Sequence, residues 1–139
     1  GEFSSHKAAT LGVMIDLSPE QASTAIAGLI GRAADPEAVM RSMRIWIRMA
    51  NCSLTQLARF YRDLFTKVDI STAGERALWQ SSITVLPPIK DPAYRIADVG
   101  PYLDFLEERL RIARTEEIRE TLESMIKRLR QQVEKLQSK

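Results

Sequence analysis

The chain has 139 residues, of which 45% are hydrophobic and 27% charged, and its formal net charge at pH 7 is +2. This length suits one domain with a substantial core, and the composition argues against a disordered or a membrane-spanning protein. A net charge of +2 excludes the strong overall positive field of a dedicated nucleic-acid-binding protein, so any basic site has to be local.

Residues 1–10 are expected to form a flexible leader, because Gly1-Glu2-Phe3 resembles the remnant of a protease and cloning site. The domain is therefore expected to come from a larger protein. Cys52 is the single cysteine, which excludes an internal disulfide, and the N-terminus lacks the pattern of a signal peptide. These features predict an intracellular, cytoplasmic location.

Four helix starts follow at regular intervals. Ser18-Pro19-Glu20-Gln21 combines an N-capping serine with proline at the first helical position, and similar signals begin at Asp35, Ser53 and Thr72. This spacing leaves room for helices of about 15 residues joined by short turns, which favour antiparallel neighbours. The sequence predicts an all-α fold: an antiparallel bundle of about five or six helices over residues 11–114, with a long C-terminal helix.

Arginines alternate with large apolar residues between Met40 and Ala50. At about 100° per residue the arginines lie within an arc of about 60°, and apolar side chains cover nearly all the rest. This pattern predicts a central helix with Trp46 buried and one narrow strip facing water. The next helix, 54–68, is amphipathic and carries further arginines on its polar side.

Together these two helices carry a candidate binding surface, the arginine patch. Six basic residues stand against two acidic ones between Pro36 and Val68. Guanidinium groups bind phosphates and carboxylates with paired hydrogen bonds, so the patch suits a nucleic acid or an acidic protein. The alternative is a solvated surface, and whether the two strips share a face depends on packing. The patch comprises Arg41, Arg44, Arg48, Arg59 and Arg62.

Three prolines between Leu86 and Gly100 predict that the fourth helix ends there and that an ordered loop follows. Pro101 is then expected to open the final helix, with Asp98 or Gly100 as its cap.

The apolar stripe of this final helix changes direction by about 100° near Thr115, where an internal N-cap is followed by two glutamates. Residues 101–137 are therefore either one helix or two. Residues 115–139 either extend beyond the bundle and self-associate, or fold back on it. The candidate self-association seam comprises Ile118, Leu122, Met125, Leu129, Val133 and Leu136.

Catalysis finds little support in the sequence. The single histidine, His6, lies in the leader, and neither a phosphate-binding glycine loop nor clustered cysteines occur. We therefore expect no cofactor, no metal and no enzymatic activity. The preferred function is a protein-interaction or assembly module whose partner is another protein or a second copy of the chain. A helical nucleic-acid-binding domain is the alternative, and a module that binds an anionic membrane surface comes third.

Overall fold

The computed structural model describes residues 2–79 and 92–138 of the chain, and every element in these ranges is a helix. The all-α class and the long C-terminal helix are thereby confirmed. Within these ranges no helix is long and apolar enough to cross a membrane. The helices are α1 (Glu2–Leu17), α2 (Pro19–Arg32), α3 (Pro36–Ala50), α4 (Leu54–Lys67), α5 (Thr72–Trp79), α6 (Pro92–Arg111) and α7 (Glu116–Gln137).

Side-chain caps begin three of the helices where the sequence predicts them. The Oγ of Ser18 accepts a hydrogen bond from the amide of Gln21, and Asp35 and Ser53 cap α3 and α4 in the same way. For α5 the capping group comes one residue earlier than predicted, because the Oγ of Ser71 accepts from the amide of Gly74. Local capping chemistry therefore sets the helix starts.

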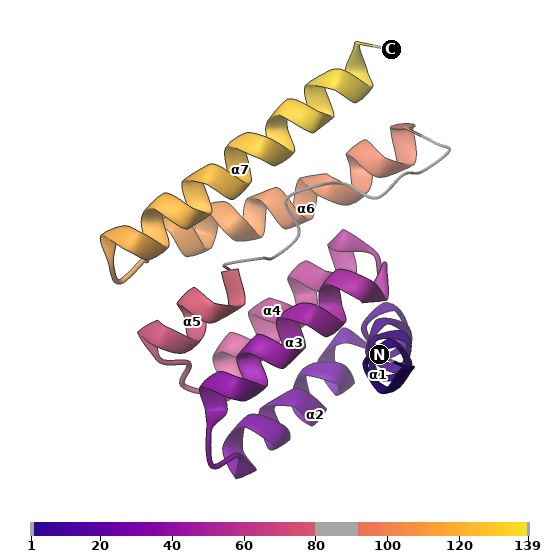
Figure 1. The fold of residues 1–139 in the computed structure, drawn as a ribbon. Helices are drawn as coiled ribbons and strands as arrows, with labels where there is room; N and C mark the ends of the chain where they lie inside the picture. The colour runs from indigo at the N-terminus through magenta and orange to yellow at the C-terminus, as the bar shows by residue number, and fades with distance from the viewer. Residues whose placement is uncertain (1, 80–91, 139) are drawn as a thin grey trace.

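The helices form two groups (Figure 1). In the first group α1 packs on α3, α2 on α4 and α3 on α5, whereas α6 and α7 pair with each other and lie across α4 and α5. Gly12 in α1 permits one close contact, since a Cβ at this position would lie 2.9 Å from the carbonyl oxygen of Ala50. Residues 2–10, predicted to be a leader, are helical and belong to α1, where Ala8 is buried.

The centre of the core is an aromatic cluster where α4, α5 and α6 meet. The ring centroid of Tyr61 lies 5.3 Å from that of Trp79 and 5.7 Å from that of Phe105. Trp79 is 1% exposed. The predicted burial of Trp46 is wrong, since this side chain is only half-buried and packs at the edge of the core.

The predicted loop before Pro101 is also wrong for its second half. Residues 92–100 form the first half of α6, which continues through Pro101, whereas residues 86–91 lie outside the described ranges. Proline removes one amide donor, but Val99, Tyr102 and Phe105 are buried on one face, and this burial outweighs the missing hydrogen bond. Asp98, predicted to cap a helix starting at Pro101, caps α4 instead.

The C-terminal region consists of two helices. α6 ends at Arg111, and the Oγ1 of Thr115 accepts a hydrogen bond from the amide of Ile118 at 3.2 Å, which starts α7. α7 runs back along α6 (Figure 1). Residues 116–137 therefore fold back on the rest of the chain, which is one of the two arrangements that the sequence left open.

Candidate interaction surface

Three arginines of the predicted patch are neutralised by the chain's own carboxylates. The Nη1 of Arg41 lies 3.3 Å from the Oε1 of Glu37, and the Nη2 of Arg59 lies 3.5 Å from the Oε1 of Glu20. Arg62 donates two hydrogen bonds to Glu108: its Nε lies 2.9 Å from Oε2, and its Nη2 lies 2.8 Å from Oε1.

The pair between Arg62 and Glu108 joins α4 to α6 and shifts the pKa of both groups. The hydrogen bonds from Arg62 lower the pKa of the Glu108 carboxyl, and the same bonds raise the pKa of the guanidinium. Arg59, one helical turn earlier in α4, is paired with Glu20 of α2. The structure therefore does not bring the two α4 arginines to the surface of α3.

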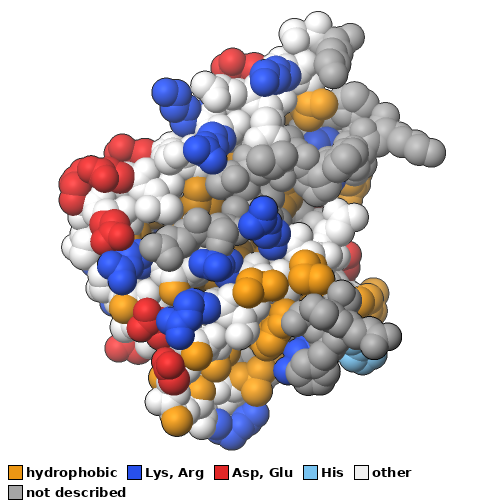
Figure 2. Space-filling model, in the orientation of Figure 1, with side chains coloured by type: hydrophobic (Ala, Val, Ile, Leu, Met, Phe, Trp, Pro, Cys, Tyr) orange, Lys and Arg blue, Asp and Glu red, His pale blue; other side chains and the backbone are white. Residues whose placement is uncertain are grey.

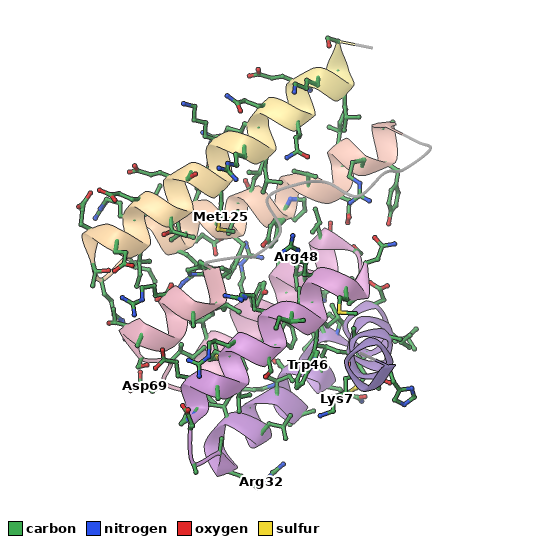
Figure 3. All side chains as sticks on the ribbon, in the orientation of Figure 1. Lys7, Arg32, Trp46, Arg48, Asp69 and Met125 are labelled. Atoms are coloured by element: carbon green, nitrogen blue, oxygen red, sulfur yellow. The ribbon has the colours of Figure 1, made fainter. Side chains whose placement is uncertain are left out.

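Arg44 and Arg48, both on α3, differ from the other three arginines. Among the described residues neither has an ion pair with a carboxylate, and the Nε of Arg44 is buried without a hydrogen-bond acceptor. Arg48 is exposed and lies on the side of α3 toward α6 (Figure 3). Trp46 lies on the other side, toward α1, where the Nζ of Lys7 is 5.1 Å from the ring centroid (Figure 3).

Two large apolar side chains stand next to these arginines. Ile45 is 45% exposed and Met49 is 46% exposed, and one helical turn separates them. The sequence predicted a single narrow arginine strip facing water, but this strip is wider and half apolar. Figure 2 shows Lys and Arg side chains beside hydrophobic ones over the middle of the molecule, where α3 lies. We call this surface the α3 face; it comprises Arg41, Arg44, Ile45, Arg48 and Met49.

The order of side chains around α3 gives this face two distinct halves. At about 100° per residue it spans about 140°, from Arg44 and Arg48 at one edge to Ile45 and Met49 at the other. Arg41 lies between these two edges and forms an ion pair with Glu37. One edge of the face therefore carries arginines with no carboxylate partner in the described ranges, and the other edge carries exposed apolar side chains.

The predicted self-association seam is covered by the chain itself. Ile118, Leu122, Met125 and Leu129 are at most 2% exposed. The remaining two seam residues, near the end of α7, are half-buried. α7 obtains this cover from α6 and, near its start, from α5. These four side chains become accessible only if α7 detaches from α6 and α5.

A buried ion pair anchors α6 to α5 beside this seam. Glu75, 1% exposed, accepts hydrogen bonds from Trp79 Nε1 at 3.1 Å and from Arg109 Nη2 at 3.0 Å. The guanidinium carbon of Arg109 lies 3.9 Å from the ring centroid of Phe65. The pairing of Glu75 with Arg109 is not predictable from the sequence, since 34 residues separate them.

A second polar network surrounds the start of α4. Burial alone would raise the pKa of Asp98, but hydrogen bonds from Ser53 Oγ and from the amides of Leu54 and Thr55 outweigh it, so that the pKa is lowered. Burial, with Asp16 adding to it, raises the pKa of the Cys52 thiol to about 12, and this thiol is therefore uncharged at neutral pH. No group of three or more potential metal ligands occurs in the parts of the chain that the structure describes.

Comparison with known proteins adds no relative: no family model, no curated protein and no solved structure matches the chain.

Proposed function

We propose that the chain is a non-enzymatic protein-interaction module of the helical-bundle type, and that its α3 face binds an acidic amphipathic segment of another protein. The observation that carries this proposal is the proximity of Ile45 and Met49, each nearly half exposed, to two arginines that have no carboxylate partner among the described residues. A partner that buries the apolar edge and brings carboxylates to Arg44 and Arg48 satisfies both halves of the face. An intracellular setting is part of the proposal.

Nucleic acid is a poorer match for the same face. Three of the five predicted arginines already hold Glu37, Glu20 and Glu108, which leaves two cations where phosphate-binding surfaces need several. Phosphates also gain nothing from the exposed hydrocarbon of Ile45 and Met49. Self-association through α7 is disfavoured for another reason, because its apolar residues already have intramolecular cover.

Chemical-shift mapping with a synthetic partner tests the proposal. The probe is a capped peptide of roughly two heptads, with leucine along one face and glutamate elsewhere, and the control peptide carries lysine in place of glutamate. We expect saturable shifts of the amides of residues 41–49 with the acidic peptide, weakened by added salt, and none with the basic peptide. Equal shifts with both peptides, or binding to DNA or to phosphatidylserine vesicles without binding to the acidic peptide, would contradict the proposal.

A further inference from the structure

A polar pocket lies where the end of α1, the turn between α3 and α4, and the first half of α6 meet. Its volume is about 440 Å³. Figure 1 shows the first turns of α6 on the same side of the molecule as the turn between α3 and α4. The pocket is lined by Asp16, Asn51, Cys52, Ser53, Gln56, Tyr94, Arg95 and Asp98.

Arg95 is the unusual residue of this pocket. It is only 5% exposed, and the single ion pair that it forms within the described part of the chain, between its Nη1 and the Oδ2 of Asp98, is 3.8 Å long, beyond hydrogen-bond distance. Its Nε is buried without an acceptor among the described residues. Burying a guanidinium donor without an acceptor is costly, so a ligand oxygen that reaches this side chain would reduce that cost.

Asp98 cannot supply that oxygen, because its carboxylate is already occupied by the start of α4. It accepts hydrogen bonds from Ser53 Oγ at 2.6 Å, from the amide of Leu54 at 2.8 Å and from the amide of Thr55 at 3.1 Å. Its backbone carbonyl accepts another from Thr55 Oγ1. Among the residues that the structure describes, the guanidinium of Arg95 therefore remains available to a ligand.

The charge of the pocket limits what this ligand can be. Asp16 is exposed, and its Oδ1 accepts a hydrogen bond from the amide of Ser53 at 2.9 Å. With Asp16 and Asp98 negative, Arg95 positive and the Cys52 thiol neutral, the ionisable side chains sum to −1. A simple anion would be attracted by Arg95 and repelled by Asp16. A ligand that also carries an ammonium group would be attracted by both residues, which form the positive and the negative wall of the pocket.

We infer that this pocket binds a free α-amino acid, whose carboxylate takes the hydrogen bonds of Arg95 and whose ammonium group lies against Asp16. The paired donors of a guanidinium fit a carboxylate, and a pocket of about 440 Å³ that is lined by both Arg95 and Asp16 has room for a molecule of this size. Tyr94, which is 53% exposed in the lining, offers an aromatic surface to the ligand's side chain.

NMR observation of the arginine Nε–H groups in the full chain tests this inference directly. L-Leucine is the probe, N-acetyl-leucine lacks its positive charge, and leucine amide lacks its negative charge. We expect leucine to shift the Arg95 resonance saturably, with an affinity about tenfold above that of either analogue. No saturable shift with leucine, or equal affinities for all three compounds, would overturn the inference.

Two variants separate the two walls of the pocket. Asp16→Asn keeps an acceptor for the amide of Ser53 but removes the charge, so it should weaken leucine about tenfold and strengthen N-acetyl-leucine. Arg95→Gln should abolish the binding of leucine and of N-acetyl-leucine. Arg111→Gln, a change at an exposed position on the same helix, should leave the affinity for both ligands unchanged. An unchanged preference in Asp16→Asn would exclude the role of Asp16, even if Arg95→Gln fails to fold.

Discussion

The carboxylate of Asp98 in α6 accepts a hydrogen bond from the amide of Leu54 at 2.8 Å, and this bond joins the start of α4 to a residue 44 positions later. Because the bond is buried, it fixes the first half of α6 on the helical group formed by α1–α5. Asp98→Ala should therefore lower the free energy of unfolding by about 1–3 kcal/mol, as measured by urea denaturation. An unchanged midpoint would show that this cap is dispensable.

The same residue gives a prediction for pH. The pKa of Asp98 is lowered in the folded chain, so its ionised form stabilises the fold above the unfolded-state pKa of about 3.9. That contribution is lost as the pH falls through the folded-state pKa. The difference in unfolding free energy between the parent and Asp98→Asn should thus be constant above about pH 5 and shrink below about pH 4. A difference that grows toward acid would contradict this assignment.

The ion pair between Glu75 and Arg109 should respond unequally to loss of either partner. Arg109→Met leaves a carboxylate that is 1% exposed without its counter-charge, which should cost about 3–5 kcal/mol. Glu75→Gln keeps an acceptor for Trp79 and leaves Arg109 stacked on Phe65, so it should cost less. Urea denaturation followed by tryptophan fluorescence measures both, and the reverse order of stabilities would count against the burial assigned to Glu75.

The two tryptophans should contribute differently to stability. Trp79 packs against Tyr61 and Phe105 and is 1% exposed, so Trp79→Ala should cost about 3–5 kcal/mol. Trp46 is half-buried, and Trp46→Ala should cost only about 1–2 kcal/mol. Thermal or urea unfolding of the two variants decides the order, and a larger loss for Trp46 would favour the core that the sequence predicted.

Leu129 tests whether α7 is held within its own chain. This side chain is 0% exposed, so Leu129→Glu should lower the midpoint of thermal unfolding while leaving the mass in sedimentation unchanged. Lys127→Glu, an exposed change on the same helix, is the matched control and should leave stability nearly unchanged. A parent that sediments as a dimer and a variant that is a folded monomer would instead establish self-association through α7.

Local signals predicted the helices more reliably than the surfaces. Ser18, Asp35 and Ser53 start helices in the structure because capping involves atoms only a few residues apart. Pro101 was misread, since a local rule for proline does not include the burial of Tyr102 and its neighbours, which holds α6 together. Helical periodicity finds an apolar side but not whether a neighbour covers it.

The candidate site shows the same division. Helical periodicity and the local excess of basic residues identified Arg44 and Arg48 in the sequence, but the same reasoning included Arg62, whose partner Glu108 is 46 residues away. Nothing in a single sequence indicates that pairing, because it depends on how α6 crosses α4. The exposure of Ile45 and Met49 was missed for the same reason. Tertiary packing therefore decides which arginines remain free of carboxylates in the described part of the chain.

The affinity of the acidic amphipathic peptide for two charge-reversed variants tests the proposed α3 face most directly. Arg44→Glu combined with Arg48→Glu should weaken binding by about tenfold or more at low salt, because both partner carboxylates then face repulsion. Lys127→Glu combined with Arg128→Glu makes the same change of charge on the exposed side of α7 and should leave the affinity within about twofold. Fluorescence anisotropy measures both. An equal loss of affinity in the two variants would mean that net charge alone attracts the peptide, and would contradict a binding site on the α3 face.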